Sequence, residues 1–117
     1  MHSLPELVSE ARRLSDLLDK GVAALREAAT SYAAAEHAYR RAHALEYLQT
    51  EGTVAEREAK TYVAMGDLRM ERDIADGVRS AALEAVRARR TQLSALQSLL
   101  AAYRSEADFD RTGTHRN

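Results

Sequence analysis

The sequence predicts an all-α protein, folded as a long antiparallel two-helix hairpin with coiled-coil-like packing. Helix-favouring residues, mainly Ala, Leu, Glu and Arg, fill nearly everything between Pro5 and Glu106. Apolar residues recur at alternating spacings of four and three, which is the pattern of a coiled-coil seam. Strong helix-breaking signals occur inside this region only around Gly52, so we expect the chain to reverse direction once.

The first helix is expected to run from about residue 4 to residue 50. Ser3 and Glu6 have the spacing of a capping box, and Pro5 is tolerated in a first helical turn. Gly21 costs about 1 kcal/mol relative to Ala in a helix interior, and a break there is the alternative that stays open. The predicted seam consists of Leu7, Ala11, Leu14, Leu18, Gly21, Leu25, Ala28, Tyr32, Ala35, Tyr39 and Ala42.

The turn is expected at residues 51–53. Gly52 can adopt the left-handed conformation that ends a helix. Thr53 can then act as the next N-cap, and Glu56 follows at the distance that completes a second capping box. Because the connection is so short, the second helix must return along the first.

The second helix is expected over residues 54–106, so residues 1–107 form a single hairpin domain. Residues 108–117 show no periodicity and are expected to form a flexible tail. The second seam is less regular than the first and passes through Arg89; it consists of Ala59, Tyr62, Leu68, Ala75, Val78, Ala82, Ala85, Leu93, Leu96, Leu100 and Tyr103.

An antiparallel pairing centred on Gly52 brings the two ends of the chain together. It predicts a leucine-rich cluster there, made of Leu4, Leu7, Val8, Leu14, Leu93, Leu96, Leu100 and Tyr103. In the middle of the hairpin, Tyr and Ala would face Ala and Gly; Tyr39, for example, would face Gly66. The small residues would let the backbones approach closely, and each Tyr would fill the space that remains.

Several large apolar residues lie off or beside both seams, so a lone hairpin would leave them in water. We therefore expect a further interface, most simply with a second copy of the chain in a homodimeric four-helix bundle. The residues assigned to dimer or partner binding are Leu17, Leu45, Leu48, Met70, Ile74, Leu83 and Leu99.

Composition excludes several classes of function. The chain has 117 residues and no Cys, which excludes disulfides, thiol catalysis and Cys-based zinc sites. Its formal charge of −1 argues against a generic nucleic-acid or anionic-membrane binder. No apolar run approaches the length of a membrane span. No phosphate loop or catalytic constellation occurs, so neither enzymatic activity nor a cofactor is expected.

A metal site is not expected either. His43 and Glu46 are three residues apart, with Glu36 and Glu58 as further candidate ligands. Di-metal bundles use Glu-x-x-His, however, and here the order is reversed.

One basic stretch makes nucleic-acid contact an alternative. It contains Arg87, Arg89, Arg90 and Arg104, which two subunits could combine into a joint strip. The antiparallel pairing places Asp16 and Asp19 near Arg87 and Arg90, so cross-helix ion pairs are the favoured explanation.

Three segments resemble small helical-hairpin proteins of tailed bacteriophages. They are Tyr39–Leu45 (YRRAHAL), Glu51–Lys60 (EGTVAEREAK) and Leu96–Glu106 (LQSLLAAYRSE). The resemblance implies an accessory factor for replication or recombination in the cytoplasm of a bacterial host, with a phage or host protein as partner. It implies no functional residues.

The function expected is therefore that of a non-enzymatic adaptor that packs a helix face against a protein partner. The alternatives are a DNA-binding accessory protein and a virion assembly or scaffold component. A further alternative is a secreted hairpin similar to the Trp-X-Gly family. Of that motif, Thr50-Glu51-Gly52 keeps only the glycine, and Ala107 stands where the export signal after Tyr103 needs an acid.

Overall fold

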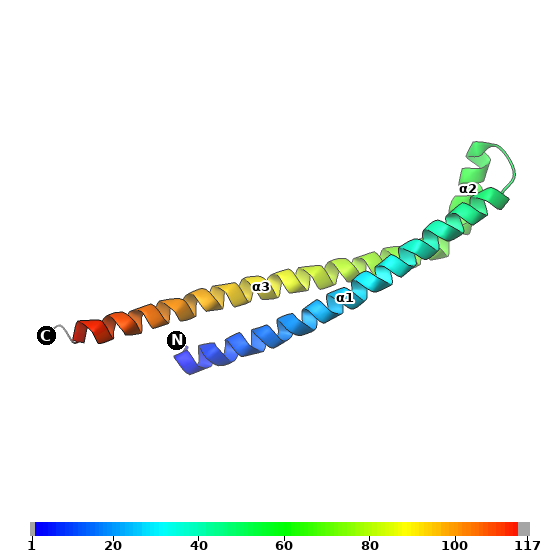
Figure 1. Cartoon of the computed structure of the whole chain (residues 1–117). Helices are drawn as coiled ribbons and strands as arrows, with labels where there is room; N and C mark the ends of the chain where they lie inside the picture. Colours follow the sequence, from blue (N-terminus) through cyan, green and yellow to red (C-terminus); the bar gives the residue numbers. More distant parts are fainter. Residues whose placement is uncertain (1, 115–117) are drawn as a thin grey trace. The chain divides into compact units, whose positions relative to one another are not determined.

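The computed structural model describes residues 2–114, which form three helices (Figure 1). These are α1 (Leu4–Gln49), α2 (Val54–Ala64) and α3 (Gly66–Thr114). No strand occurs among the described residues. The prediction of an all-α helical hairpin is confirmed, whereas dimerisation stays a prediction.

Both predicted capping boxes contain the expected hydrogen bond to the cap side chain. The Ser3 hydroxyl accepts a hydrogen bond from the Glu6 amide at 3.3 Å, and the Ser3 amide donates to the Glu6 carboxylate at 3.4 Å. The Thr53 hydroxyl accepts from the Glu56 amide at 3.2 Å. Gly52 has φ +125°, a backbone conformation that L side chains rarely adopt. The turn therefore lies where the sequence places it.

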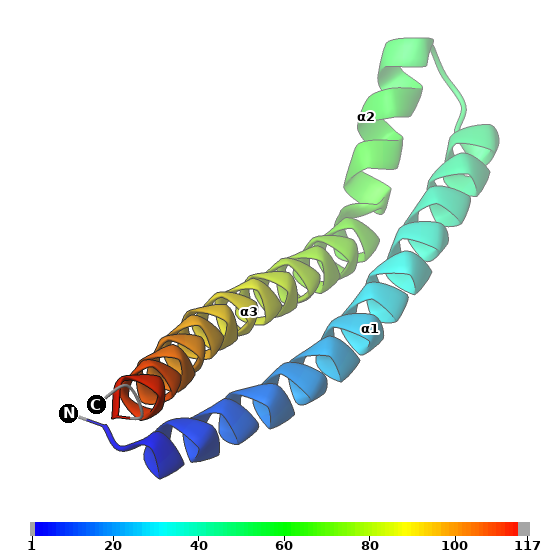
Figure 2. The same cartoon turned by 60° about the vertical axis from the view of Figure 1, so that its left-hand side comes forward.

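The prediction of one continuous second helix over residues 54–106 is wrong at Met65, which separates α2 from α3. Met65 has φ −89° and ψ 4°, and its buried side chain lies just before Gly66, a poor helix former. Its amide donates to the Thr61 carbonyl and its carbonyl accepts from the Arg69 amide, both at 2.9 Å. The helix direction thus changes between α2 and α3 while these backbone hydrogen bonds are kept (Figure 2).

Helix α1 is continuous through Gly21, so the alternative prediction of a break there is wrong. A Cβ at Gly21 would lie 3.4 Å from Cγ2 of Val86. Val86 is 1% exposed and packs against α1 at this point, at a distance that would be an ordinary van der Waals contact for a Cβ.

Helix α3 continues to Thr114, beyond the end expected at residue 106, so residues 108–114 of the predicted flexible tail are helical. Two interactions are made along this extension. Arg111 pairs with Asp108 at 2.7 Å, and the Thr112 hydroxyl donates to the Asp108 carbonyl at 2.8 Å. The remainder of the predicted tail, residues 115–117, lies outside the described residues.

The chain divides into two compact units. The terminal unit comprises Met1–Val22 with Glu84–Asn117, and the turn unit comprises Ala23–Leu83. The terminal unit contains most of the predicted leucine-rich cluster, although Leu4 is exposed. Its buried members are Leu7, Leu14, Leu96 and Leu100, and Val8, Ala11, Leu93 and Tyr103 pack around them.

The turn unit is built differently, because four arginine side chains stack on four tyrosine rings. The distances from guanidinium carbon to ring centroid are 4.6 Å for Arg79 on Tyr32, 4.3 Å for Arg72 on Tyr39, 4.1 Å for Arg57 on Tyr47, and 3.8 Å for Arg69 on Tyr62.

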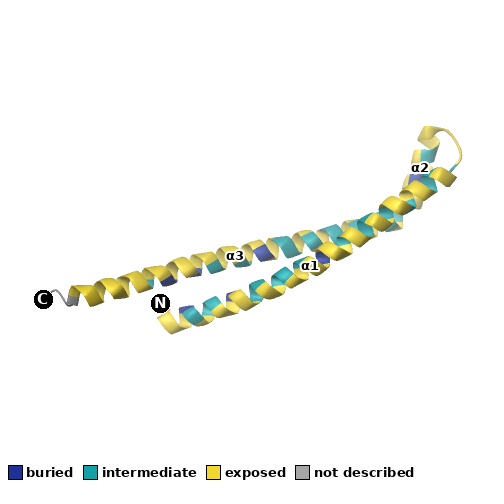
Figure 3. Ribbon diagram, viewed as in Figure 1, coloured by how far each residue is buried: buried dark blue, intermediate teal, exposed yellow. Residues whose placement is uncertain are grey.

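These stacks correct the expectation that tyrosines would fill space opposite Gly and Ala. In particular, Tyr39 packs against Arg72 where Gly66 was expected. Arginines with long aliphatic stems occupy part of the interface between the helices. Most of the helix surface outside this interface is exposed (Figure 3).

Thr61 is 0% exposed, and its buried hydroxyl has no hydrogen-bond partner among residues 2–114. Replacing Thr61 with Val keeps the shape and removes this unpaired group, so we expect the free energy of unfolding to rise by about 1 kcal/mol. Urea denaturation of the two proteins measures the change. Thr61→Ala is the control, because it removes the methyl group as well and should not stabilise the chain.

Candidate functional site

The residues predicted to bind a partner are distributed over both compact units. Leu17 and Leu99 belong to the terminal unit, and the other five belong to the turn unit. Leu17 and Leu83 are half-buried, and their use by a partner stays a prediction. The exposed members are Leu45, Leu48, Met70, Ile74 and Leu99.

One groove in the turn unit, called here the tyrosine groove, lies between α1 and α2. It has a volume of about 470 Å³. Leu48, which is 75% exposed, is the one residue of the predicted set that lines it. The lining residues are Tyr39, His43, Ala44, Tyr47, Leu48, Glu58 and Tyr62.

The tyrosine rings of this groove are held in place by the arginines that stack on them. Arg57 also donates to the backbone carbonyl of Tyr47 at 2.7 Å, and Arg69 donates to that of Tyr62 at 3.2 Å. Each of these guanidinium groups therefore fixes both the ring and the backbone of one tyrosine. Such bracing lowers the entropy that these side chains lose on binding.

Arg72 braces the third ring of the groove, that of Tyr39, and is itself fixed by two carboxylates. It donates to Asp73 at 3.1 and 3.0 Å and lies 3.7 Å from Glu36. The hydrogen bonds to Asp73 raise the pKa of Arg72, with Coulombic attraction from Asp73 and Glu36 adding to the effect. The guanidinium, which is charged in arginine without any such shift, lies over the Tyr39 ring.

This arrangement can bind an apolar or aromatic side chain. Rigid tyrosines offer a large contact area at a low entropic cost, and they are enriched among residues that dominate binding energy. Sequence reasoning missed the groove. A signal for the stacks, one of which braces the groove at Tyr39, was present, because Tyr32 and Tyr39 are seven residues apart, as are Arg72 and Arg79.

A second surface of the turn unit, called here the α3 stripe, consists of Met70, Ile74, Gly77 and Ala81. Their spacing of four, three and four is that of a coiled-coil seam. All four are exposed, with Met70 at 63% and Ile74 at 57%. The structure thus confirms that Met70 and Ile74 are exposed and adds two small neighbours that the prediction did not include.

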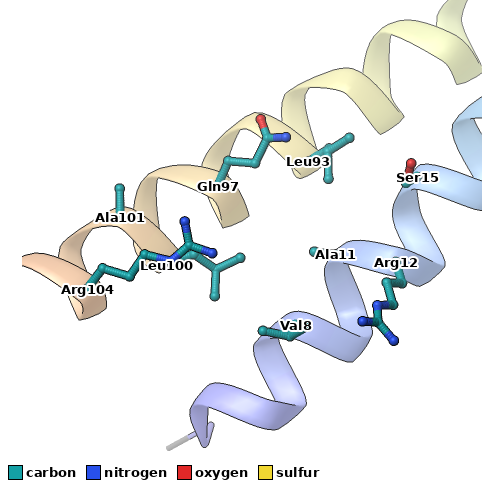
Figure 4. Close-up of a pocket in the computed structure, with 9 residues that line it drawn as sticks. All are labelled: Val8, Ala11, Arg12, Ser15, Leu93, Gln97, Leu100, Ala101 and Arg104. Carbon is teal, nitrogen blue, oxygen red and sulfur yellow. The ribbon is translucent and has the colours of Figure 1, made fainter. Parts of the chain in front are cut away.

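A third surface belongs to the terminal unit and is called here the arginine groove (Figure 4). It has a volume of about 440 Å³. Arg12 lies on its α1 side and Arg104 on its α3 side, and these are the two charged residues among those that line it. The other lining residues are Val8, Ala11, Ser15, Leu93, Gln97, Leu100 and Ala101.

The predicted basic strip divides into arginines with different surroundings. Arg87 pairs with Glu84 of its own helix at 3.2 Å. Arg89 is half-buried and donates to Gln92 at 3.2 Å. Arg90 and Arg104 are exposed and make no ion pair within the described part of the chain.

The cross-helix ion pairs expected for Arg87 and Arg90 with Asp16 and Asp19 do not form among residues 2–114. The reason for Arg87 is local. Glu84 lies three residues earlier on the same helix, where a side chain can reach it without crossing to α1.

Residues 2–114 contain no group of three His, Asp or Glu side chains placed to hold a metal ion. Within the same range, no helix combines the length and apolar character that a membrane span requires. Comparisons with protein families, curated proteins and solved structures found no match.

Proposed function

We propose that this protein is a non-enzymatic interaction protein that binds a protein partner by helix-face packing at the tyrosine groove. The observation that carries the proposal is that three arginine-braced tyrosine rings line one groove and that Leu48 stands exposed at it. Exposed apolar groups on rigid supports are typical of binding surfaces. Apolar side chains of a partner helix would insert between the rings.

The resemblance to phage hairpin proteins supports a first choice of partner. Replication and recombination proteins of a phage or its bacterial host are the class to test first, and the protein would act in the host cytoplasm. DNA contact has less support, because Arg87 is paired with Glu84 and Arg89 is half-buried.

The test is a binding measurement with a variant whose groove is blocked by a charge. Because Leu48 is largely exposed, Leu48→Lys leaves the packing of α1 intact while it places an ammonium group at the groove. Proteins captured by the wild-type chain are identified, purified and titrated against both chains. We expect Leu48→Lys to bind at least about tenfold more weakly. The loss of an interface residue that dominates binding costs more than about 1 kcal/mol of binding free energy.

Leu45→Lys is the matched control, because Leu45 lies on the same helix and is exposed but does not line the groove. It should bind as the wild-type chain does. Equal affinities of the Leu48 and Leu45 variants for every captured protein would contradict the proposal.

A further inference from the structure

We propose that the α3 stripe of one copy of this chain packs into the arginine groove of a second copy. These two surfaces share no residue with the tyrosine groove. The inference is therefore independent of the function proposed above.

The first argument concerns the glycine in the stripe. A Cβ at Gly77 would meet nothing within 4 Å, so packing inside the chain does not require a glycine there. Glycine in a helix interior costs about 1 kcal/mol relative to alanine. Its place between Ile74 and Ala81, in an exposed seam, is explained if a helix from another molecule crosses closely at this point.

The second argument concerns the shapes of the two surfaces. The stripe presents two large side chains, Met70 and Ile74, beside two small residues on one helix. The arginine groove presents an apolar floor made by Val8, Leu93 and Leu100, between two helices. A ridge of one helix fits into such a groove in helix packing, and the added helix would start a bundle.

The third argument is charge, and it identifies the occupant. Asp67 and Glu71 each lie three residues before a large side chain of the stripe, and neither is ion-paired within the described chain. Arg12 and Arg104 of the groove are likewise unpaired there. If the stripes of two copies met, the carboxylates beside them would face each other. If two grooves met, their arginines would face each other. Only the contact of a stripe with a groove pairs opposite charges.

Each copy carries both surfaces, so association either closes into a two-fold dimer or continues from copy to copy. A dimer is the assembly predicted from the sequence. Association that continues from copy to copy would instead build a scaffold. Both assemblies use the same contact and the same residues. The solution mass as a function of concentration distinguishes them.

The experiment combines charge reversal with measurement of solution mass by sedimentation over two orders of magnitude in concentration. The groove variant carries Arg12→Glu and Arg104→Glu, and the stripe variant carries Asp67→Arg and Glu71→Arg. We expect the wild-type chain to associate and each variant alone to associate at least about tenfold more weakly. An equimolar mixture should recover the wild-type mass, because opposite charges then meet again at both contacts.

A chain with Arg26→Glu and Arg41→Glu is the matched control, since it changes the net charge equally through exposed arginines outside the groove. It should associate as the wild-type chain does. Circular dichroism verifies that every variant stays helical. If the groove variant unfolds, Arg12→Gln with Arg104→Gln replaces it in the measurement of weakened association alone, and the mixture is not used as a test. Leu48→Lys should leave self-association unchanged, so the two proposals fail separately.

Three results would overturn the inference. They are a monomeric wild-type chain at all concentrations, a groove variant that associates normally, and a mixture that does not recover the wild-type mass. Added salt should weaken association, because it screens exposed charges.

Discussion

Replacing Leu14 with Ala is expected to lower the free energy of unfolding by about 3 kcal/mol. Leu14 is 4% exposed and packs in the buried cluster with Leu7, Leu96 and Leu100. The exchange removes apolar contacts from both helices and leaves a cavity that a cluster of four buried side chains cannot readily fill. It should therefore be among the most damaging single substitutions in the chain.

Urea denaturation followed by far-ultraviolet circular dichroism measures this loss. Leu48→Ala is the matched control, because it deletes the same atoms from an exposed position and should change stability by less than about 0.5 kcal/mol. Similar losses at positions 14 and 48 would refute the assignment of the terminal-unit cluster as the main apolar core.

Replacing Gly52 with Ala is expected to cost about 1–3 kcal/mol of folding free energy. The φ of +125° disfavours any L side chain. An added Cβ would also lie 2.7 Å from Oε2 and 3.2 Å from Cβ of Glu56, the residue whose amide donates to the Thr53 cap. The Glu56 carboxylate can rotate away, but the contact with the Glu56 Cβ requires a small shift of the turn or of the start of α2.

The same exchange at Gly113 is the control for this prediction, since a Cβ there meets nothing within 4 Å and no positive φ is involved. Thermal unfolding of the two variants is compared with that of the wild-type chain. We expect a clear decrease in Tm for Gly52→Ala alone. Equal responses would contradict the strained turn.

The sequence predicted those parts of the fold that depend on local chemistry. Ser3 and Thr53 mark helix starts because each has a glutamate three residues later that fits a capping box. Gly52 marks the turn because a positive φ needs glycine. Pairing the helices outward from that turn was then sufficient to find the buried cluster around Leu14.

Two features were not predicted from the sequence, namely the interruption at Met65 and the arginine–tyrosine stacks. The interruption at Met65 has no proline to signal it and keeps its backbone hydrogen bonds. The arginine–tyrosine stacks escaped detection because arginine is normally assigned to the exposed side of a helix. Its stem, however, reaches across the interface and brings a guanidinium over a ring, as Arg72 does over Tyr39.

The candidate site was predictable only in part. Periodicity showed that Leu48, Met70 and Ile74 lie off the seams, and the structure confirms that they are exposed. Periodicity could not show which residues would lie next to these three side chains. The tyrosine groove combines residues of α1 with Glu58 and Tyr62 of α2, a separate helix that the sequence did not predict.

The arginine–tyrosine stacks give the two units different responses to temperature. Unfolding the leucine-lined terminal unit exposes mainly apolar surface, which raises heat capacity, whereas guanidinium and phenol groups add polar surface, which lowers it. The turn unit should therefore contribute less heat-capacity change per residue. Cooling would weaken the leucine cluster more than the stacks, so the balance of local stability would move towards the turn in the cold.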